Sequence, residues 1–162
     1  MNILIVVESF FGNTREIAQV ISSSLTELGH AVTLQEISDA PLTIADDIDV
    51  LVVGAPTHNR GMSTPQSRLK ASEGQHSEEE QGVREWLTSL TFAGTPAIAA
   101  FDTVTSRSWI NGSAAKKIAK VLSAHARGNK IAIKSFIVRS AAGPLAPTQT
   151  MEAQSWASSL VQ

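Results

Sequence analysis

Short, unbroken runs of aliphatic side chains constrain the fold of this chain more than any other feature. Residues 3–7 read Ile-Leu-Ile-Val-Val, and comparable runs recur at residues 49–55, 96–101 and 130–138. A strand that is covered on both faces, as in a parallel sheet, carries apolar residues at every position rather than at every second one. Residues 30–37 instead alternate polar and apolar side chains. That alternation indicates a strand near the edge of the same sheet.

The segments between these runs have the periodicity of amphipathic helices. Apolar residues recur three and four positions apart within residues 14–28, 79–90 and 113–127, and more weakly within residues 148–160. Gly29 and Gly128 follow two of these segments, at the position where glycine commonly ends a helix. This order of elements predicts an α/β fold: a doubly wound five-stranded parallel sheet of strand order 2-1-3-4-5, with helices on both faces.

Composition excludes several classes of protein. The chain has 162 residues, and we expect residues 1–162 to form a single domain with a polar surface insert at residues 70–81. Without cysteine it forms no disulfide and performs no thiolate chemistry, and a formal net charge of -2 without a basic patch argues against a nucleic-acid partner. No apolar run reaches the length of a membrane span, and no signal peptide is recognisable, so we expect a cytoplasmic protein. We single out no catalytic residue and no metal ligand.

The loop between the first strand and the first helix has the features of an anion site. It reads Ser9-Phe10-Phe11-Gly12-Asn13-Thr14. Gly12 lets the backbone turn tightly, and the amides that follow it lie at the positive end of the helix. Such a helix start binds a phosphate without lysine or arginine, and Ser9, Asn13 and Thr14 add polar side chains. The alternative is an ordinary turn in which Asn13 or Thr14 only caps the helix.

The pattern S-x-x-G-N-T between a strand and a helix resembles the phosphate loop of the flavodoxin family. The resemblance implies a flavodoxin-like fold with FMN bound at the carboxyl edge of the sheet. Flavodoxins have hydroxyl residues at the positions that Phe10 and Phe11 occupy here. This chain is therefore an atypical member by sequence, in which Ser9, Thr14 and backbone amides carry more of the phosphate binding.

The loop after the third strand is similar to the family loop that lines the flavin ring. It contains Pro56, Thr57, His58, Asn59, Arg60 and Gly61. A flavin ring needs an apolar wall together with donors to its carbonyls and ring nitrogen, which this loop can supply. We interpret Gly61 as the residue whose peptide can turn toward the ring, because glycine tolerates either orientation. The alternative is a surface loop with no ligand.

The loop after the fourth strand corresponds to the third flavin loop of the family. Its candidate residues are Asp102, Thr103 and Trp109. Flavodoxins commonly stack a tyrosine or tryptophan on the ring, and because this chain has no tyrosine, Trp109 is the aromatic candidate. In the alternative interpretation Trp109 folds back over the end of the sheet. Trp86 and Trp156 lie on the apolar faces of helices and are expected in the core.

The resemblance implies a low-potential electron carrier that works between redox partner proteins, a reductase and an acceptor. Two features differ from that description. The net charge is only -2, whereas acidic carriers dock on basic partners through their charge, and Arg60 and Arg107 are expected near the cofactor. An FMN-dependent quinone or NAD(P)H oxidoreductase on the same fold, taking a small quinone-like substrate, is therefore the alternative. A flavodoxin-like domain that has lost FMN is a further one, because of Phe10 and Phe11.

Overall fold

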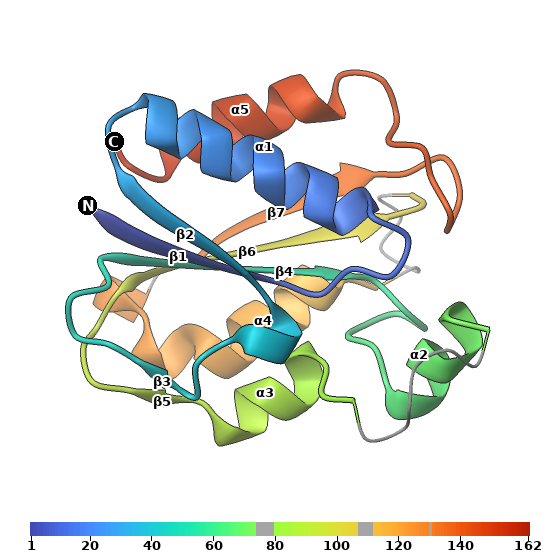
Figure 1. Ribbon diagram of the computed structural model, residues 1–162, viewed down its shortest axis with the longest axis horizontal. Helices are drawn as coiled ribbons and strands as arrows, with labels where there is room; N and C mark the ends of the chain where they lie inside the picture. Colours follow the sequence, from blue (N-terminus) through green and yellow to red (C-terminus); the bar gives the residue numbers. More distant parts are fainter. Residues whose placement is uncertain (74–79, 107–111, 130) are drawn as a thin grey trace.

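A computed structural model describes residues 1–73, 80–106, 112–129 and 131–162 of the chain (Figure 1). The strands are β1 (Asn2–Val7), β2 (Ala31–Glu36), β3 (Thr43–Ile44), β4 (Val50–Pro56), β5 (Thr91–Phe92), β6 (Ala97–Val104) and β7 (Ile131–Ile137). The α-helices are α1 (Asn13–Glu27), α2 (Pro65–Ala71), α3 (Val83–Ser89), α4 (Ala114–Leu122) and α5 (Gln149–Ser159). None of the helices in these ranges is long and apolar enough to cross a membrane.

Five of the strands form one parallel sheet in the order β2-β1-β4-β6-β7. Counted along the chain, these are the five predicted strands in the order 2-1-3-4-5, so the predicted doubly wound sheet is confirmed. The chain reverses its direction of progress between β1 and β4, and ligands of such sheets bind at the carboxyl ends of the strands near that point. β2 lies at one edge of the sheet, as its alternating pattern indicated.

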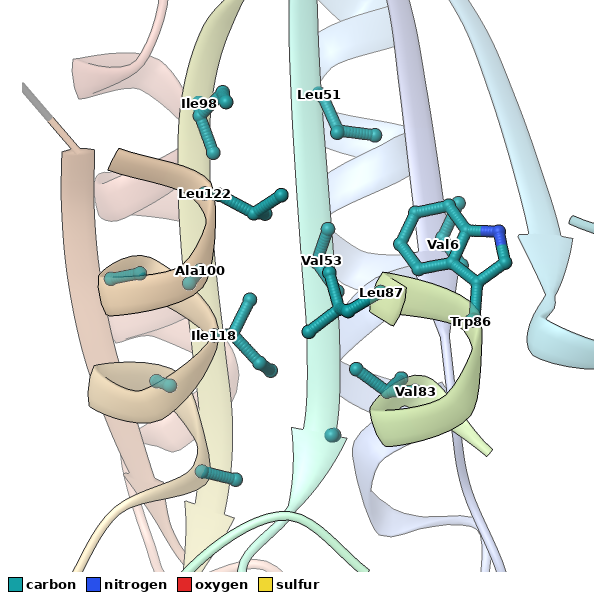
Figure 2. Close-up of a cluster of buried hydrophobic side chains, with 14 of the residues drawn as sticks. Val6, Leu51, Val53, Val83, Trp86, Leu87, Ile98, Ala100, Ile118 and Leu122 are labelled. Carbon is teal, nitrogen blue, oxygen red and sulfur yellow. The ribbon is translucent and has the colours of Figure 1, made fainter. Parts of the chain in front are cut away.

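Helices α1 and α5 cover one face of the sheet, and α3 and α4 cover the other (Figure 1). Successive residues of β1 point to opposite faces: Ile3 and Ile5 pack under α1, whereas Leu4 and Val6 belong to the opposite core. Figure 2 shows this second core, in which the fully buried Trp86 lies near Val6 and Val83. Burial on both faces is the reason why the strand sequence is uniformly aliphatic.

The structure also contains elements that the hydrophobic pattern did not indicate. β3 and β5 form a separate two-stranded parallel sheet, each strand being two residues long. Helix α2 begins at Pro65 after Thr64, whose side chain accepts a hydrogen bond from the amide of Ser67 at 3.2 Å. The only buried residue of α2 is the charged Arg68, so this helix has no apolar stripe to reveal it.

Other predicted boundaries shift. α3 begins at Val83 rather than at residue 79, and α4 ends at Leu122, where a short 3-10 helix, Ser123–His125, replaces the last predicted turn. Of the polar segment predicted as an insert at residues 70–81, the first two residues belong to α2. Residues 74–79 lie outside the described part of the chain.

Candidate functional site

The segment that joins β1 to α1 holds the start of the helix open. Gly12 has a φ of 90°, in the left-handed region that favours glycine, and as the residue before the helix it has no side chain that could cap it. No hydrogen bond joins the amides of Asn13 and Thr14 to any residue in the described ranges. The alternative in which Asn13 or Thr14 acts as the cap therefore does not apply. Unpaired amides at a helix start attract an anion, because their partial positive charges point at the same place.

A cavity of about 80 Å³ adjoins this helix start, and we call it the first cavity. Its walls come from the loops after β1, β4, β6 and β7: Ser9, Phe10, Phe11, Asn13, Thr14, Pro56, Thr57, His58, Thr103, Thr105, Val138 and Ala141. The hydroxyls of Thr14 and Thr103 lie 2.9 Å apart on its floor. When one of them donates to the other, the acceptor keeps its own hydrogen for a ligand oxygen. The donor set fits a phosphate ester.

Thr103 supplies a hydroxyl that replaces part of the hydrogen bonding lost at Phe10 and Phe11, where flavodoxins have hydroxyl residues. It is buried and reaches the first cavity from β6, whereas Phe11 is 48% exposed at the rim. Phe10 packs against the ring of His58, with 5.2 Å between the ring centroids. Ser9 is already engaged, since its hydroxyl oxygen accepts a hydrogen bond from the amide of Arg15 at 3.2 Å. The hydroxyls near the open helix start are therefore those of Ser9, Thr14 and Thr103.

A second cavity of about 230 Å³ shares Thr57 and Thr105 with the first. Its remaining walls are Asn59, Arg60 and Val104. Arg60 is exposed, so the second cavity has a positively charged side chain at its opening. The two cavities lie side by side along the carboxyl edge of the sheet, and together they have room for more than a phosphate group.

A tight turn separates the second cavity from helix α4. The amide of His58 donates to the carbonyl of Gly61 at 2.8 Å, and the amide of Gly61 donates back at 2.9 Å. Asn59 and Arg60 between them have φ values of 45° and 68°, so the turn has two left-handed residues. Both backbone polar groups of Gly61 are thus engaged in this turn. A Cβ atom at Gly61 would lie 2.5 Å from Nζ of Lys117.

Asp102 stands behind the site rather than in it. The side chain is fully buried, and its Oδ2 atom accepts hydrogen bonds from Thr57 Oγ1 at 2.9 Å, Ser113 Oγ at 2.6 Å and the amide of Ala115 at 3.1 Å. The Thr57 hydroxyl oxygen also accepts from the amide of Ala114 at 2.9 Å. This network fixes the loop after β4 to the start of α4, so Asp102 positions Thr57.

A second buried charged cluster, formed by Glu8 and Arg68, joins the end of β1 to helices α2 and α3. Glu8 is 2% exposed, and its Oε2 atom accepts a hydrogen bond from the amide of Val83 at 2.6 Å. Burial raises the pKa of Glu8, and hydrogen bonds from Ser63 and Val83 together with the charge of Arg68 offset only part of that rise. Arg68, also 2% exposed, donates to Ser63 Oγ at 3.0 Å and pairs with Glu85 at 3.1 Å.

The structure brings most of the predicted site residues together. Ser9, Phe10, Phe11, Asn13, Thr14, Pro56, Thr57, His58 and Thr103 line the first cavity, and Asn59 and Arg60 line the second. Gly12, Gly61 and Asp102 shape the loops without lining either cavity. Trp109 and Arg107 lie outside the described residues, so the structure does not place them.

Sequence reasoning missed the contribution of the loop after β7. Val138 and Ala141 line the first cavity, and Gly143 packs against the side chain of Asn13. The signal was available, because β7 is parallel to its neighbours and its carboxyl end therefore reaches the same edge of the sheet. Thr105, one residue beyond β6, was also missed.

The fold is that of a doubly wound α/β protein, and the open start of α1 lies at the switch point of its sheet. No family model matches the sequence, and no curated protein matches it. Solved structures do match. Oxidised Flavodoxin 1 from Bacillus cereus is similar over 99% of this chain and 97% of its own, with 18% identity and a TM-score of 0.67.

Two further solved structures extend this comparison. Two-electron reduced flavodoxin from Megasphaera elsdenii has 19% identity and a TM-score of 0.59 over 97% of this chain and 98% of its own. Rubredoxin oxygen:oxidoreductase from Desulfovibrio gigas matches 98% of this chain with 35% of its own length, at 18% identity and a TM-score of 0.59. The chain therefore has the flavodoxin-like fold that the S-x-x-G-N-T segment predicted.

Proposed function

We propose that this chain binds FMN along the carboxyl edge of its sheet and carries electrons between redox partner proteins. The observation that supports it best is the open start of α1, whose unpaired amides face a cavity lined by hydroxyls. In this proposal the amides of Asn13 and Thr14 and the hydroxyls of Ser9, Thr14 and Thr103 bind the phosphate. The adjoining second cavity takes the remainder of the ligand. When bound, FMN supplies a ring that accepts and releases electrons.

In this proposal the chain's own residues fix the walls that hold the ligand. Thr57 is held by hydrogen bonds to Asp102 and from the amide of Ala114, so this wall of the first cavity is preformed in the absence of a ligand. His58 and Phe10 form an aromatic side of the same cavity. A preformed site loses less conformational entropy on binding, which favours affinity.

An absorption spectrum of the purified protein and a titration with FMN test this proposal. We expect the purified protein to be yellow. After bound flavin has been removed, we expect the flavin-free protein to bind added FMN saturably. Thr14→Val removes one hydroxyl from the floor of the first cavity and should weaken binding about 3- to 10-fold, the effect of one neutral hydrogen bond. Thr26→Val, near the other end of the same helix, is the matched control and should bind FMN like the wild type. A colourless protein that does not take up added FMN would overturn the proposal.

Two observations favour an FMN-dependent quinone or NAD(P)H oxidoreductase as the second candidate. The second cavity carries the exposed Arg60 at its opening, and a net charge of -2 gives little of the acidic surface that a carrier uses for docking. Steady oxidation of NADPH by the purified protein with a soluble quinone would identify the enzyme. If the bound flavin is reduced only after a flavodoxin reductase has been added, the chain is the carrier.

A further inference from the structure

His58 is held by a serine that closes the first turn of helix α2. Nδ1 of the His58 ring lies 3.2 Å from Ser67 Oγ. The same Ser67 oxygen accepts a hydrogen bond from the amide of Thr64 at 2.8 Å and donates one to the carbonyl of Thr64 at 3.1 Å. Three contacts therefore meet at one hydroxyl group, which has a single hydrogen to give.

The number of hydrogen bonds that can form at Ser67 favours one tautomer of His58. If the Ser67 hydroxyl donates to the carbonyl of Thr64, its contact with Nδ1 is a hydrogen bond only when Nδ1 carries the proton. All three contacts are then satisfied together. The other tautomer would need the same hydroxyl hydrogen for Nδ1, so the Thr64 carbonyl would keep only the hydrogen bond that it accepts from the amide of Arg68 at 2.9 Å. The hydrogen bonds thus favour a neutral ring with the proton on Nδ1 and a lone pair on Nε2.

The surroundings of His58 keep the ring neutral. Burial lowers the pKa of His58, and the charge of Arg68 from α2 lowers it further. Phe10 covers part of the ring from the β1–α1 side and adds no charge. Within the described ranges no carboxylate forms a hydrogen bond or ion pair with His58 that would favour the charged form.

The ring lines the first cavity, and Nε2 accepts no hydrogen bond from the described residues. The helix amides beside that cavity only donate, and its serine and threonine hydroxyls both donate and accept, whereas Nε2 of this tautomer only accepts. We propose that His58 selects the ligand of this site by presenting Nε2 as a hydrogen-bond acceptor for an N–H or O–H group. This inference rests on the proposed function, in which the ligand is FMN. FMN carries such donors in its ring imide and its ribityl hydroxyls.

Nitrogen NMR of the histidine rings in the ligand-free protein tests the first half of this proposal. We expect His58 to show a protonated Nδ1 and an unprotonated Nε2 at neutral pH, with the exposed His125 and the half-buried His30 as internal controls outside the first cavity. A protonated Nε2, or a doubly protonated ring, would overturn the proposal. This measurement needs no flavin, so it is independent of whether the chain binds FMN.

Addition of FMN tests the second half. We expect the Nε2 resonance of His58 to shift on saturation while those of His30 and His125 stay in place. His58→Phe keeps a ring but loses the acceptor, and should raise the Kd for FMN about 3- to 10-fold. Ser67→Ala keeps His58 but releases its tautomer, and should give mixed protonation of the ring and a smaller loss of affinity. An Nε2 resonance that FMN leaves unchanged would refute the role in ligand selection even if FMN binds tightly.

Discussion

Replacement of Asp102 by asparagine is the most direct test of how the site is held in place. The Oδ2 atom of Asp102 accepts three hydrogen bonds in a fully buried position, from Thr57, Ser113 and the amide of Ala115. Asparagine has nearly the same shape, and its amide oxygen can accept from the same donors. Its NH2 group, however, takes the position of Oδ1, which is buried without a hydrogen-bond partner in the described structure.

The magnitude follows from the loss of charge. Hydrogen bonds to a charged group contribute about 1.5–3 kcal/mol each and neutral ones about 1 kcal/mol, so three bonds lose roughly 3 kcal/mol together. Burying an amide costs less than burying a carboxylate, and this returns part of the loss. We expect Asp102→Asn to lower the free energy of unfolding by about 1–3 kcal/mol. Asp102→Ala, which leaves three donors without an acceptor, should lower it by about 3–5 kcal/mol.

Urea denaturation at neutral pH measures these changes, and a titration with FMN measures their effect on the site. Because Asp102 fixes Thr57 in the cavity wall, Asp102→Asn should also weaken FMN binding, although Asp102 itself does not line the cavity. Asp46→Asn removes the same charge at an exposed position and should change stability by less than about 0.5 kcal/mol. An Asp102→Asn variant as stable as the wild type would refute the assignment of Asp102 as the residue that holds the two loops together.

Three further substitutions test other parts of the structure. Gly54→Ala places a methyl group where the ring of Phe101 packs and should destabilise the fold by about 3 kcal/mol in urea denaturation, a loss that Phe101→Leu in the same chain should partly reverse. Gly12→Ala meets no neighbouring atom, so its cost of about 1–2 kcal/mol should come only from a φ of 90°, and calorimetry should show it together with weaker FMN binding. Glu8→Gln tests the raised pKa of Glu8: the stability that protonated Glu8 contributes is complete below its ordinary pKa of 4.5 and is lost as the pH rises through the folded-state pKa. The wild type should therefore lose stability relative to Glu8→Gln from pH 4.5 up to the folded-state pKa, by at most about 1.4 kcal/mol per pH unit, in urea denaturation at each pH.

Each of these has an outcome that would contradict it. A Gly54→Ala protein of wild-type stability would mean that Phe101 moves without cost. A Gly12→Ala protein with unchanged stability would mean that the turn before α1 can adopt another backbone conformation. A stability difference between the wild type and Glu8→Gln that is constant with pH would mean that Glu8 titrates alike in the folded and unfolded chains.

The sequence by itself determined the sheet and the edge of it at which the candidate site lies. Buried parallel strands must be apolar on both faces, so residues 3–7 and 49–55 were recognisable without any tertiary information. A glycine before a helix start, as at Gly12, is a local feature of the backbone and was equally readable. Parallel strands bring their carboxyl ends to one edge, which is why loops far apart in the sequence were expected to meet there.

Only the tertiary structure decided which side chains line the first cavity and which support its walls. Asp102 and Thr103 are neighbours in the sequence, but successive residues of a strand point to opposite faces, so one holds α4 while the other reaches the cavity. The tautomer of His58 depends on Ser67, in a helix whose buried residue is charged and which therefore left no apolar pattern. Such contacts join elements through hydrogen bonds between specific atoms, and no periodicity of the sequence encodes them.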